Sequence, residues 1–224
     1  MSRSFVLADS QTLDDLQVFL ARAARIEEGS VRLIAGSGVL AVYVAVFYPV
    51  GLLDESPTVL GLRTVALAPG EDGAASAFDA VVPIRSLLTR IEGAQRSGVT
   101  TVALPMEVNT VTWAAISPPR GGWQAGRPTT SGVLDAAARA GIDEVAAALP
   151  SGAGEQIVRR VRSEVWSRPI AGLEHVPAGA GFAALGLGFL GDDEVRVYET
   201  GPWTRLTMQR GHVLIKRKAW TLSR

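Results

Sequence analysis

The chain has 224 residues, of which 47% are hydrophobic and 20% are charged. This is the composition of an ordinary soluble globular protein, long enough for one large domain or for two of about 100 residues each. The absence of cysteine excludes a disulfide framework, a thiolate nucleophile and a cysteine metal site. The N-terminal apolar stretch is too short for a signal peptide, so we expect a cytoplasmic protein.

The formal net charge is zero, but the charges are unevenly distributed along the chain. Residues 1–158 carry 11 basic and 16 acidic side chains, whereas residues 159–224 carry 11 basic and 6 acidic side chains. This asymmetry fits either an anionic partner for the C-terminal part or attraction between two parts of one protein. We favour the second interpretation.

The first half of the sequence predicts strands covered by two amphipathic helices. A strand over residues 3–8 is followed by a helix that starts with a capping box at Thr12 and ends at Gly29, and a second helix follows Pro83. The remaining strands are expected at Ser30–Ala35, Val39–Tyr48, Thr58–Ala68, Phe78–Val82, Val99–Leu104 and Thr110–Ile116. The predicted order is therefore β-α-β-β-β-β-α-β-β.

An uncharged stretch from Leu33 to Leu53 is long enough for a membrane helix. Glycine at positions 36 and 38 and the Pro49-Val-Gly51 segment divide this stretch, and its middle is rich in valine and tyrosine. The pattern therefore favours two buried strands over a membrane span.

The element order over residues 1–116, together with the run from Phe78 to Ile91, resembles one repeat of the sliding clamps of DNA replication. In that family a strand leads into a short amphipathic helix, as this run does. The resemblance implies a clamp-like fold for residues 1–116, but clamp helices carry lysines and arginines, whereas this half of the chain is acidic. A shared fold does not by itself transfer function.

The segment 117–128 interrupts the regular structure, because its prolines and glycines disfavour both a helix and a ladder strand. Within it, Arg120, Trp123 and Arg127 could form a stacking and anion-binding patch for a planar or phosphorylated ligand. The alternative is that Trp123 only packs the linker onto one half of the protein. The sequence favours the packing role, although these three residues are the best candidate ligand site.

The second half predicts two helices and then a β-meander. The first helix begins with Ser131 as its cap and stops before Pro150, and the second covers Glu155 to Ser167. The predicted strands are Phe182–Leu190, Glu194–Glu199, Trp203–Gln209 and His212–Arg217.

The expected fold class is therefore α+β, with two halves built from mainly antiparallel sheets covered by amphipathic helices. The predicted boundaries are an N-terminal domain over residues 1–117, a linker over 118–128 and a C-terminal domain over 129–224. The arginine-rich, cysteine-free composition with alanine-rich helices also resembles a conserved actinobacterial protein family. That resemblance implies no particular activity.

Two weak motifs have simpler structural explanations. Gly179-Ala-Gly181-Phe-Ala-Ala184 matches a dinucleotide-binding fingerprint, but Pro177 and the later glycines favour a glycine-bearing strand at a bulge. The stretch from Ala136 to Leu149, with Gly141 in a possible turn, has the layout of a helix-turn-helix. Its second helix offers no side chain that could read a base edge, so a plain helical hairpin is favoured.

No metal or cofactor site is expected. The only histidines, His175 and His212, lack partners at ligand spacing, and the acidic turn from Asp192 to Glu194 lacks the spacing of a calcium loop. A group of basic residues is the candidate anion-binding set. It consists of Arg159, Arg160, Arg162, Lys216, Arg217 and Lys218.

The favoured function is a non-enzymatic binding or assembly module whose partner is another protein or a second copy of the chain. One alternative is an enzyme or sensor for a phosphorylated or nucleotide ligand, and a second is a clamp-like nucleic-acid-associated protein. Because the acidic first half offers an internal counter-charge to the basic tail, we expect no tight binding of duplex DNA at physiological salt.

Overall fold

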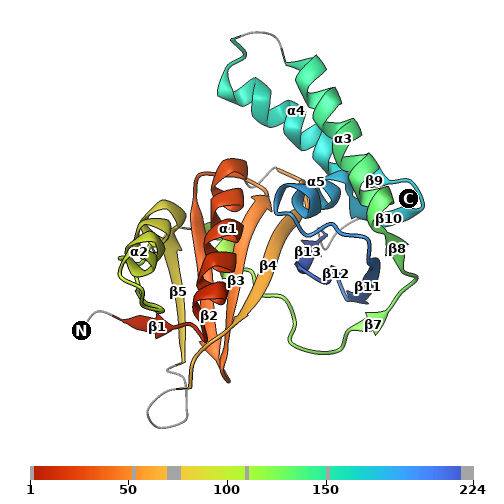
Figure 1. The fold of residues 1–224 in the computed structure, drawn as a ribbon. Coiled ribbons are helices and arrows are strands. Elements are labelled where there is room, and N and C mark those ends of the chain that lie inside the picture. Colours follow the sequence, from red (N-terminus) through yellow and green to blue (C-terminus); the bar gives the residue numbers. More distant parts are fainter. Residues whose placement is uncertain (1–2, 52–53, 70–76, 109–110, 150–151, 218–224) are drawn as a thin grey trace. The chain divides into compact units, whose positions relative to one another are not determined.

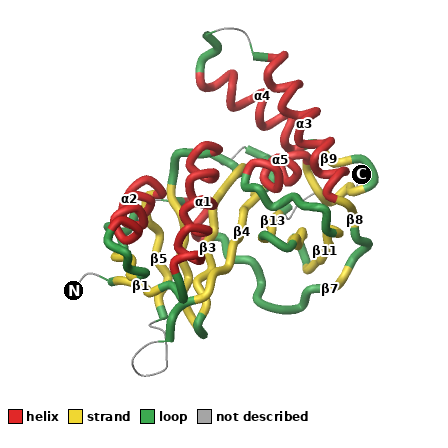
Figure 2. Tube along the Cα trace, in the orientation of Figure 1, coloured by secondary structure: helices red, strands yellow, loops and turns green. Residues whose placement is uncertain are grey.

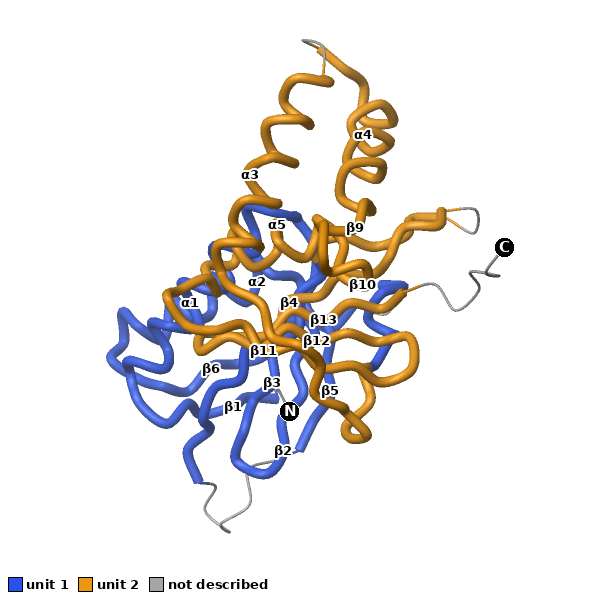
Figure 3. Tube along the Cα trace, turned by 90° about the vertical axis from the view of Figure 1, so that its right-hand side faces the viewer, with its two compact units in different colours: residues 1–45, 62–117 blue, residues 46–61, 118–224 orange. Residues whose placement is uncertain are grey.

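The computed structural model describes residues 3–51, 54–69, 77–108, 111–149 and 152–217. The protein has the predicted α+β fold, in which antiparallel strands pair with one another and helices pack against them (Figures 1 and 2). It divides into two compact units, the first formed by residues 1–45 and 62–117 and the second by residues 46–61 and 118–224 (Figure 3).

Unit 1 is built on strands in the order β5-β2-β3-β4. A separate pair, β1 and β6, places Phe5 opposite Val102. The ends of β3 and β4 that fall within residues 46–61 belong to unit 2. The strands of this region are β1 (Ser4–Val6), β2 (Ser30–Gly36), β3 (Val39–Phe47), β4 (Thr58–Ala66), β5 (Phe78–Pro83) and β6 (Thr101–Ala103).

The two helices of unit 1, α1 (Ser10–Ile26) and α2 (Ile84–Arg96), lie side by side (Figure 1). Their buried side chains recur at helical spacing, and alternate residues of β2 are buried as in a strand with one covered face. The cap of α1 differs from the prediction at Thr12. The Asp9 carboxylate accepts a hydrogen bond from the Thr12 amide at 2.7 Å, which lowers the pKa of Asp9.

The predicted strand Thr110–Ile116 is wrong, because residues 112–115 form a 3₁₀ helix, η1 (Thr112–Ala115). Trp113 in this turn is buried, with only 4% of its surface exposed. The Arg32 guanidinium from β2 donates to the Ala114 carbonyl at 2.7 Å and to the Ser117 hydroxyl at 2.8 Å. These tertiary bonds hold the segment as a turn instead of a ladder strand.

Unit 2 has strands in the order β13-β12-β11-β7, and β8 also pairs with β11. A hairpin of β9 and β10 stands apart from this sheet. The strands are β7 (Gln124–Ala125), β8 (Thr129–Thr130), β9 (Pro169–Ile170), β10 (Leu173–Pro177), β11 (Glu194–Thr200), β12 (Trp203–Met208) and β13 (Gly211–Lys216). The helices are α3 (Ser131–Ala148), α4 (Glu155–Ser167) and α5 (Ala178–Gly186).

Four sequence expectations for unit 2 are wrong. The predicted strand Phe182–Leu190 is largely the helix α5, and the expected plain succession of two helices and a meander is interrupted by β9, β10 and α5. The segment expected to exclude a ladder strand contains the two residues of β7. Ser131 does not cap α3, because Thr130 occupies the cap position and the Ser131 hydroxyl donates to the Asp193 carbonyl.

Close packing around Trp166 explains the glycines of α3 and α5. A β-carbon on Gly141 would lie 2.3 Å from the Trp166 ring, and one on Gly181 would lie 2.6 Å from the Leu134 carbonyl oxygen. The Trp166 ring stacks on Phe182 with 4.5 Å between ring centres. Gly141 therefore lies inside one continuous helix, and the expected break at this position is wrong.

The stretch from Leu33 to Leu53 contains β-structure, as its valine-rich pattern predicts. Among the residues that the structure describes, no helix has the length and apolar character needed to cross a membrane.

Candidate functional site

The predicted ligand residue Trp123 packs on an arginine that the sequence did not single out. The centre of the Arg205 guanidinium lies 4.6 Å from the centre of the Trp123 ring and 4.6 Å from the centre of the Tyr198 ring. The Trp123 indole also donates a hydrogen bond to the Pro119 carbonyl at 3.0 Å. Arg205 therefore contacts two aromatic rings, in a stack of Trp123, Arg205 and Tyr198.

The other two predicted ligand residues, Arg120 and Arg127, are exposed and lie on either side of Trp123 in the chain. Neither forms a salt bridge within the described part of the chain. The guanidinium that the structure brings to Trp123 is thus that of Arg205. A role of Arg120, Trp123 and Arg127 in ligand binding stays a prediction.

The stack belongs to one face of the meander β11–β12–β13. Tyr198 pairs with Arg205 across β11 and β12, and Arg196 pairs with Thr207. On the same face His212 pairs with Thr207, and its Nδ1 atom lies 3.1 Å from the Thr207 hydroxyl. Sequence reasoning missed Arg196, Tyr198 and Arg205, although period-2 alternation across the meander is the signal that places them on one face.

Burial lowers the pKa of His212 below its ordinary value of 6.5, and the nearby Arg205 cation lowers it further. The imidazole is therefore neutral at pH 7.

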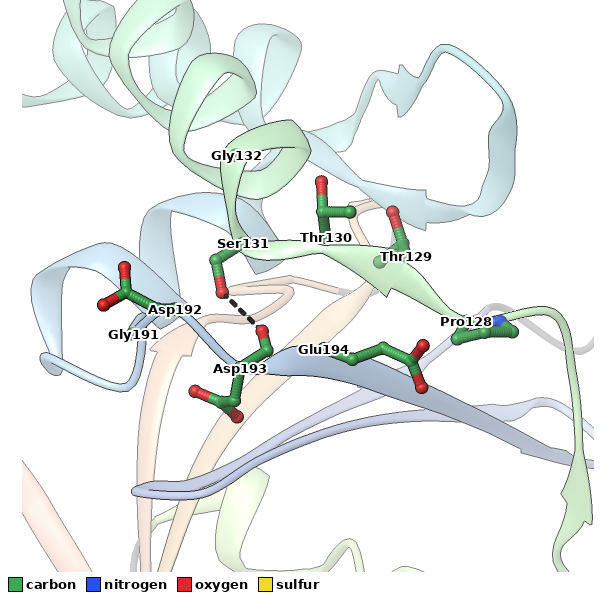
Figure 4. A pocket seen from close by; sticks show the side chains of 9 residues that line it. All are labelled: Pro128, Thr129, Thr130, Ser131, Gly132, Gly191, Asp192, Asp193 and Glu194. Atoms are coloured by element: carbon green, nitrogen blue, oxygen red, sulfur yellow. Dashed lines mark hydrogen bonds between the residues drawn. The ribbon is translucent and has the colours of Figure 1, made fainter.

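A cavity of about 460 Å³ lies at the N-terminus of α3 (Figure 4). In Figure 4 the carboxylates of Asp192, Asp193 and Glu194 point in different directions. The Asp193 carboxylate accepts from the Gln209 amide at 2.9 Å, so it stabilises the turn. Within the described part of the chain, no three histidine or acidic side chains are grouped as a metal site would require.

A second cavity of about 360 Å³ surrounds Arg217 and His175. The Arg217 guanidinium donates to Nδ1 of His175 at 2.9 Å and to the Gly201 carbonyl at 3.1 Å. Because a guanidinium only donates, Nδ1 of His175 is the acceptor and the ring proton is on Nε2. The two terminal nitrogens of Arg217 are therefore already bonded, and Glu55 and Glu174 in the same cavity disfavour an anion there.

The predicted anion-binding residues form two groups on different elements. Arg159, Arg160 and Arg162 belong to α4, which extends away from the sheet of unit 2 (Figure 1). Arg159 is paired with Glu155 on the same helix at 2.5 Å. The second group lies at the end of β13, where Lys216 Nζ is 5.9 Å from the centre of the Trp203 ring. Lys218 lies outside the described residues.

The glycine fingerprint, residues 179–184, lies within α5, so the predicted glycine-bearing strand is wrong. Beside Gly179 an added β-carbon would meet the Trp166 backbone at 3.1 Å, and beside Gly181 it would meet α3. The space next to these glycines is filled by protein. They serve helix packing, and a pyrophosphate could not approach them.

The fold places the chain in the class of clamp-like α+β proteins. Similar structures include DNA polymerase III subunit beta from Borrelia burgdorferi in complex with a natural product, with a TM-score of 0.54 and 7% identity over 99% of this chain and 66% of that chain. The same subunit from Pseudomonas aeruginosa has a TM-score of 0.48 and 14% identity over 100% of this chain and 66% of that chain. The DnaN sliding clamp from Bartonella birtlesii bound to griselimycin has a TM-score of 0.48 and 12% identity over 99% of this chain and 67% of that chain. Only the first TM-score exceeds 0.5, so the likeness of fold is taken from that structure.

The chain belongs to the family of the domain of unknown function DUF8010, whose family model matches residues 1–114. Residues 118–220 match a second domain of unknown function, DUF8185. No curated protein matches the chain. The clamp likeness, expected for residues 1–116, extends over nearly the whole chain, and the chain spans about two thirds of the length of those clamps.

Proposed function

We propose that the protein is a non-enzymatic binding or assembly module of the cytoplasm that uses a clamp-like fold as its scaffold. The observation that carries this proposal is the correspondence of 99% of the chain with DNA polymerase III subunit beta from Borrelia burgdorferi at a TM-score of 0.54. The likeness concerns the fold, so the partner must be inferred from this chain's own surfaces. Its first partner is taken to be another protein or a second copy of the chain.

Self-association is the direct test. The protein is loaded at about 1 to 100 μM, so that complexes with dissociation constants in that range are populated. Light scattering coupled to size-exclusion chromatography should then give a mass above the 23.6 kDa of one chain at the higher loads. The same protein is screened by thermal shift against nucleotides and sugar phosphates. A ligand present at about 100 times its dissociation constant stabilises by about 2.7 kcal/mol.

Such a ligand would raise Tm by about 5 to 10 °C for a chain of this length. The proposal expects no shift of that size with mononucleotides or sugar phosphates. A monomer at every load together with a large shift by one of these compounds would instead favour the enzyme or sensor alternative.

The second candidate function is a clamp-like protein that associates with nucleic acid. The observation that favours it is the set of cations on the meander face of unit 2, which includes Arg196 and Arg205.

A further inference from the structure

The register of the meander places three cations on one diagonal of the sheet. Arg196 lies on β11 and pairs with Thr207 on the neighbouring strand β12. Arg205 lies two residues from Thr207 on β12, opposite Tyr198. The next step along the same diagonal reaches Lys216 on β13, opposite Trp203. Strands are about 4.8 Å apart and two residues span about 6.8 Å, so successive cations lie about 8 Å apart and the line is about 17 Å long.

An aromatic line runs beside the cation line. Tyr198 on β11 and Trp203 on β12 occupy the adjacent diagonal of the same face, since their cross-strand partners are Arg205 and Lys216. The Arg205 guanidinium lies over the Tyr198 ring, and the Lys216 ammonium is near the Trp203 ring. Trp123 adds a third ring over Arg205.

The charges of the cation line are not neutralised within the described part of the chain. Arg196 is exposed and Arg205 and Lys216 are half-buried, and none of the three forms a salt bridge with a described carboxylate. The other described arginines of unit 2 that pair with acids do so on α3, on α4 or just after α4. The opposite face of the meander is covered, since Gly211 lies against the buried Phe189 ring.

We infer that this face of the meander binds the backbone of single-stranded nucleic acid, with Arg196, Arg205 and Lys216 contacting successive phosphates. This inference rests on the proposed binding function and names a partner for it. Regularly spaced cations suit a polyanion, and the half-exposed rings of Tyr198 and Trp123 beside them suit bases, which stack on any π-face. The Trp203 ring is buried, so it supports Lys216 and does not stack on a base. The rings of Trp123 and Tyr198 fix the orientation of the planar Arg205 guanidinium, whose N–H donors can bind two oxygens of one phosphate.

An acidic protein segment is the other polyanion that three cations could attract. It would leave the half-exposed rings of Tyr198 and Trp123 without a stacking partner, because carboxylate side chains have no π-face. The interleaving of rings and cations therefore favours nucleic acid, and the acidic polymer becomes a competitor in the test.

The test measures fluorescence anisotropy of a labelled oligothymidylate of about 20 nucleotides, longer than the cation line, with the full chain. Three phosphate contacts on a single strand give a slope of about −2 in a plot of log affinity against log salt, so affinity should fall about 20-fold between about 0.05 and 0.2 M NaCl. The variant R196A/R205A/K216A should bind at least about 10-fold more weakly and lose most of this slope.

A matched control removes the same charge elsewhere. The variant R22A/R90A/R96A replaces three exposed arginines of the unit 1 helices and should leave both affinity and slope unchanged. Because the loss of Arg205 could disturb the stack, R196E/K216E, which retains it, should weaken binding at least as much. Circular dichroism checks that every variant is folded.

The inference would be overturned if oligothymidylate did not bind the chain at about 0.05 M salt. It would also be overturned if the two triple variants bound oligothymidylate equally well. Polyglutamate that binds the chain while oligothymidylate does not would overturn it in favour of an acidic protein partner. Light scattering on R196A/R205A/K216A separates the two proposals, because self-association that persists leaves the assembly function standing even if nucleic acid fails to bind.

Discussion

Replacing Gly141 by alanine should destabilise unit 2, although alanine is the better helix former. In a helix interior the change from glycine to alanine gains about 1 kcal/mol from backbone entropy. The new methyl carbon would, however, lie 2.3 Å from one Trp166 ring carbon and 2.8 Å from the next. Carbon atoms in contact are normally about 3.5 to 4.0 Å apart, so the ring would have to move by more than 1 Å.

The Trp166 ring has little room for such a movement. It stacks on Phe182 at 4.5 Å, and the backbone of Trp166 lies against Gly179. Overpacking of this kind costs about 1 to 3 kcal/mol. After the gain in helix propensity, we expect Gly141→Ala to lower the free energy of unfolding by up to about 2 kcal/mol.

The matched control is Gly93→Ala in α2, where an added β-carbon would meet nothing within 4 Å. That variant should be neutral or more stable by up to about 1 kcal/mol. Urea unfolding followed by far-UV circular dichroism and by tryptophan fluorescence gives the midpoint and slope for each variant. The cost of Gly141→Ala should also shrink in a Trp166→Phe background, because phenylalanine lacks the ring carbons that clash.

A rise of the midpoint in Gly141→Ala equal to the rise in Gly93→Ala would refute this reasoning. An unchanged cost of Gly141→Ala in the Trp166→Phe background would do the same, since the clash would then lie elsewhere.

Three further outcomes are expected. The Arg32 hydrogen bonds lower the pKa of Asp79, so Asp79→Asn should lower the free energy of unfolding by about 1 kcal/mol at pH 7. This difference from wild type should vanish as the pH falls through the folded pKa of Asp79, which denaturation curves recorded at decreasing pH would show. Burial lowers the pKa of His212, so the stability that the neutral imidazole contributes is complete above pH 6.5 and is lost as the pH falls through the folded pKa of His212. In thermal melts from acid to neutral pH, the variant His212→Gln should not show this acid-dependent loss of stability. Limited trypsin digestion should cut first after Arg120, which is exposed outside helices and is followed by Gly121, whereas Pro128 protects the bond after the exposed Arg127. A first cut within α2 or α4, seen by mass spectrometry, would contradict this expectation.

Much of the fold could be predicted from local pattern. The helical spacing of Leu13, Leu16 and Leu20 places α1, and the alternation in β2 places a strand with one covered face. The meander could likewise be predicted, because the turns at Gly201 and Gly211 separate runs of alternating character. Local pattern was sufficient in these regions because each segment buries one face against a single neighbouring layer.

The candidate site was only partly accessible from the sequence. Trp123 is conspicuous in a loop, but the arginine on which it packs is 82 positions further along the chain. Arg196, Arg205 and Lys216 form a line only through the register of β11, β12 and β13, since a shift of one residue would move a side chain to the opposite face of the sheet.

The tertiary structure alone decided the helix α5 and the continuity of α3. The Ala-Gly run at 178–186 is apolar at both helical and strand spacing, so its pattern cannot distinguish the two, and Gly141 has the local signature of a helix break. What decides both is the bulk of Trp166, whose ring fills the space beside Gly141 and stacks on Phe182. Glycine is needed there because a distant side chain occupies the volume of its missing β-carbon, and no local propensity records that volume.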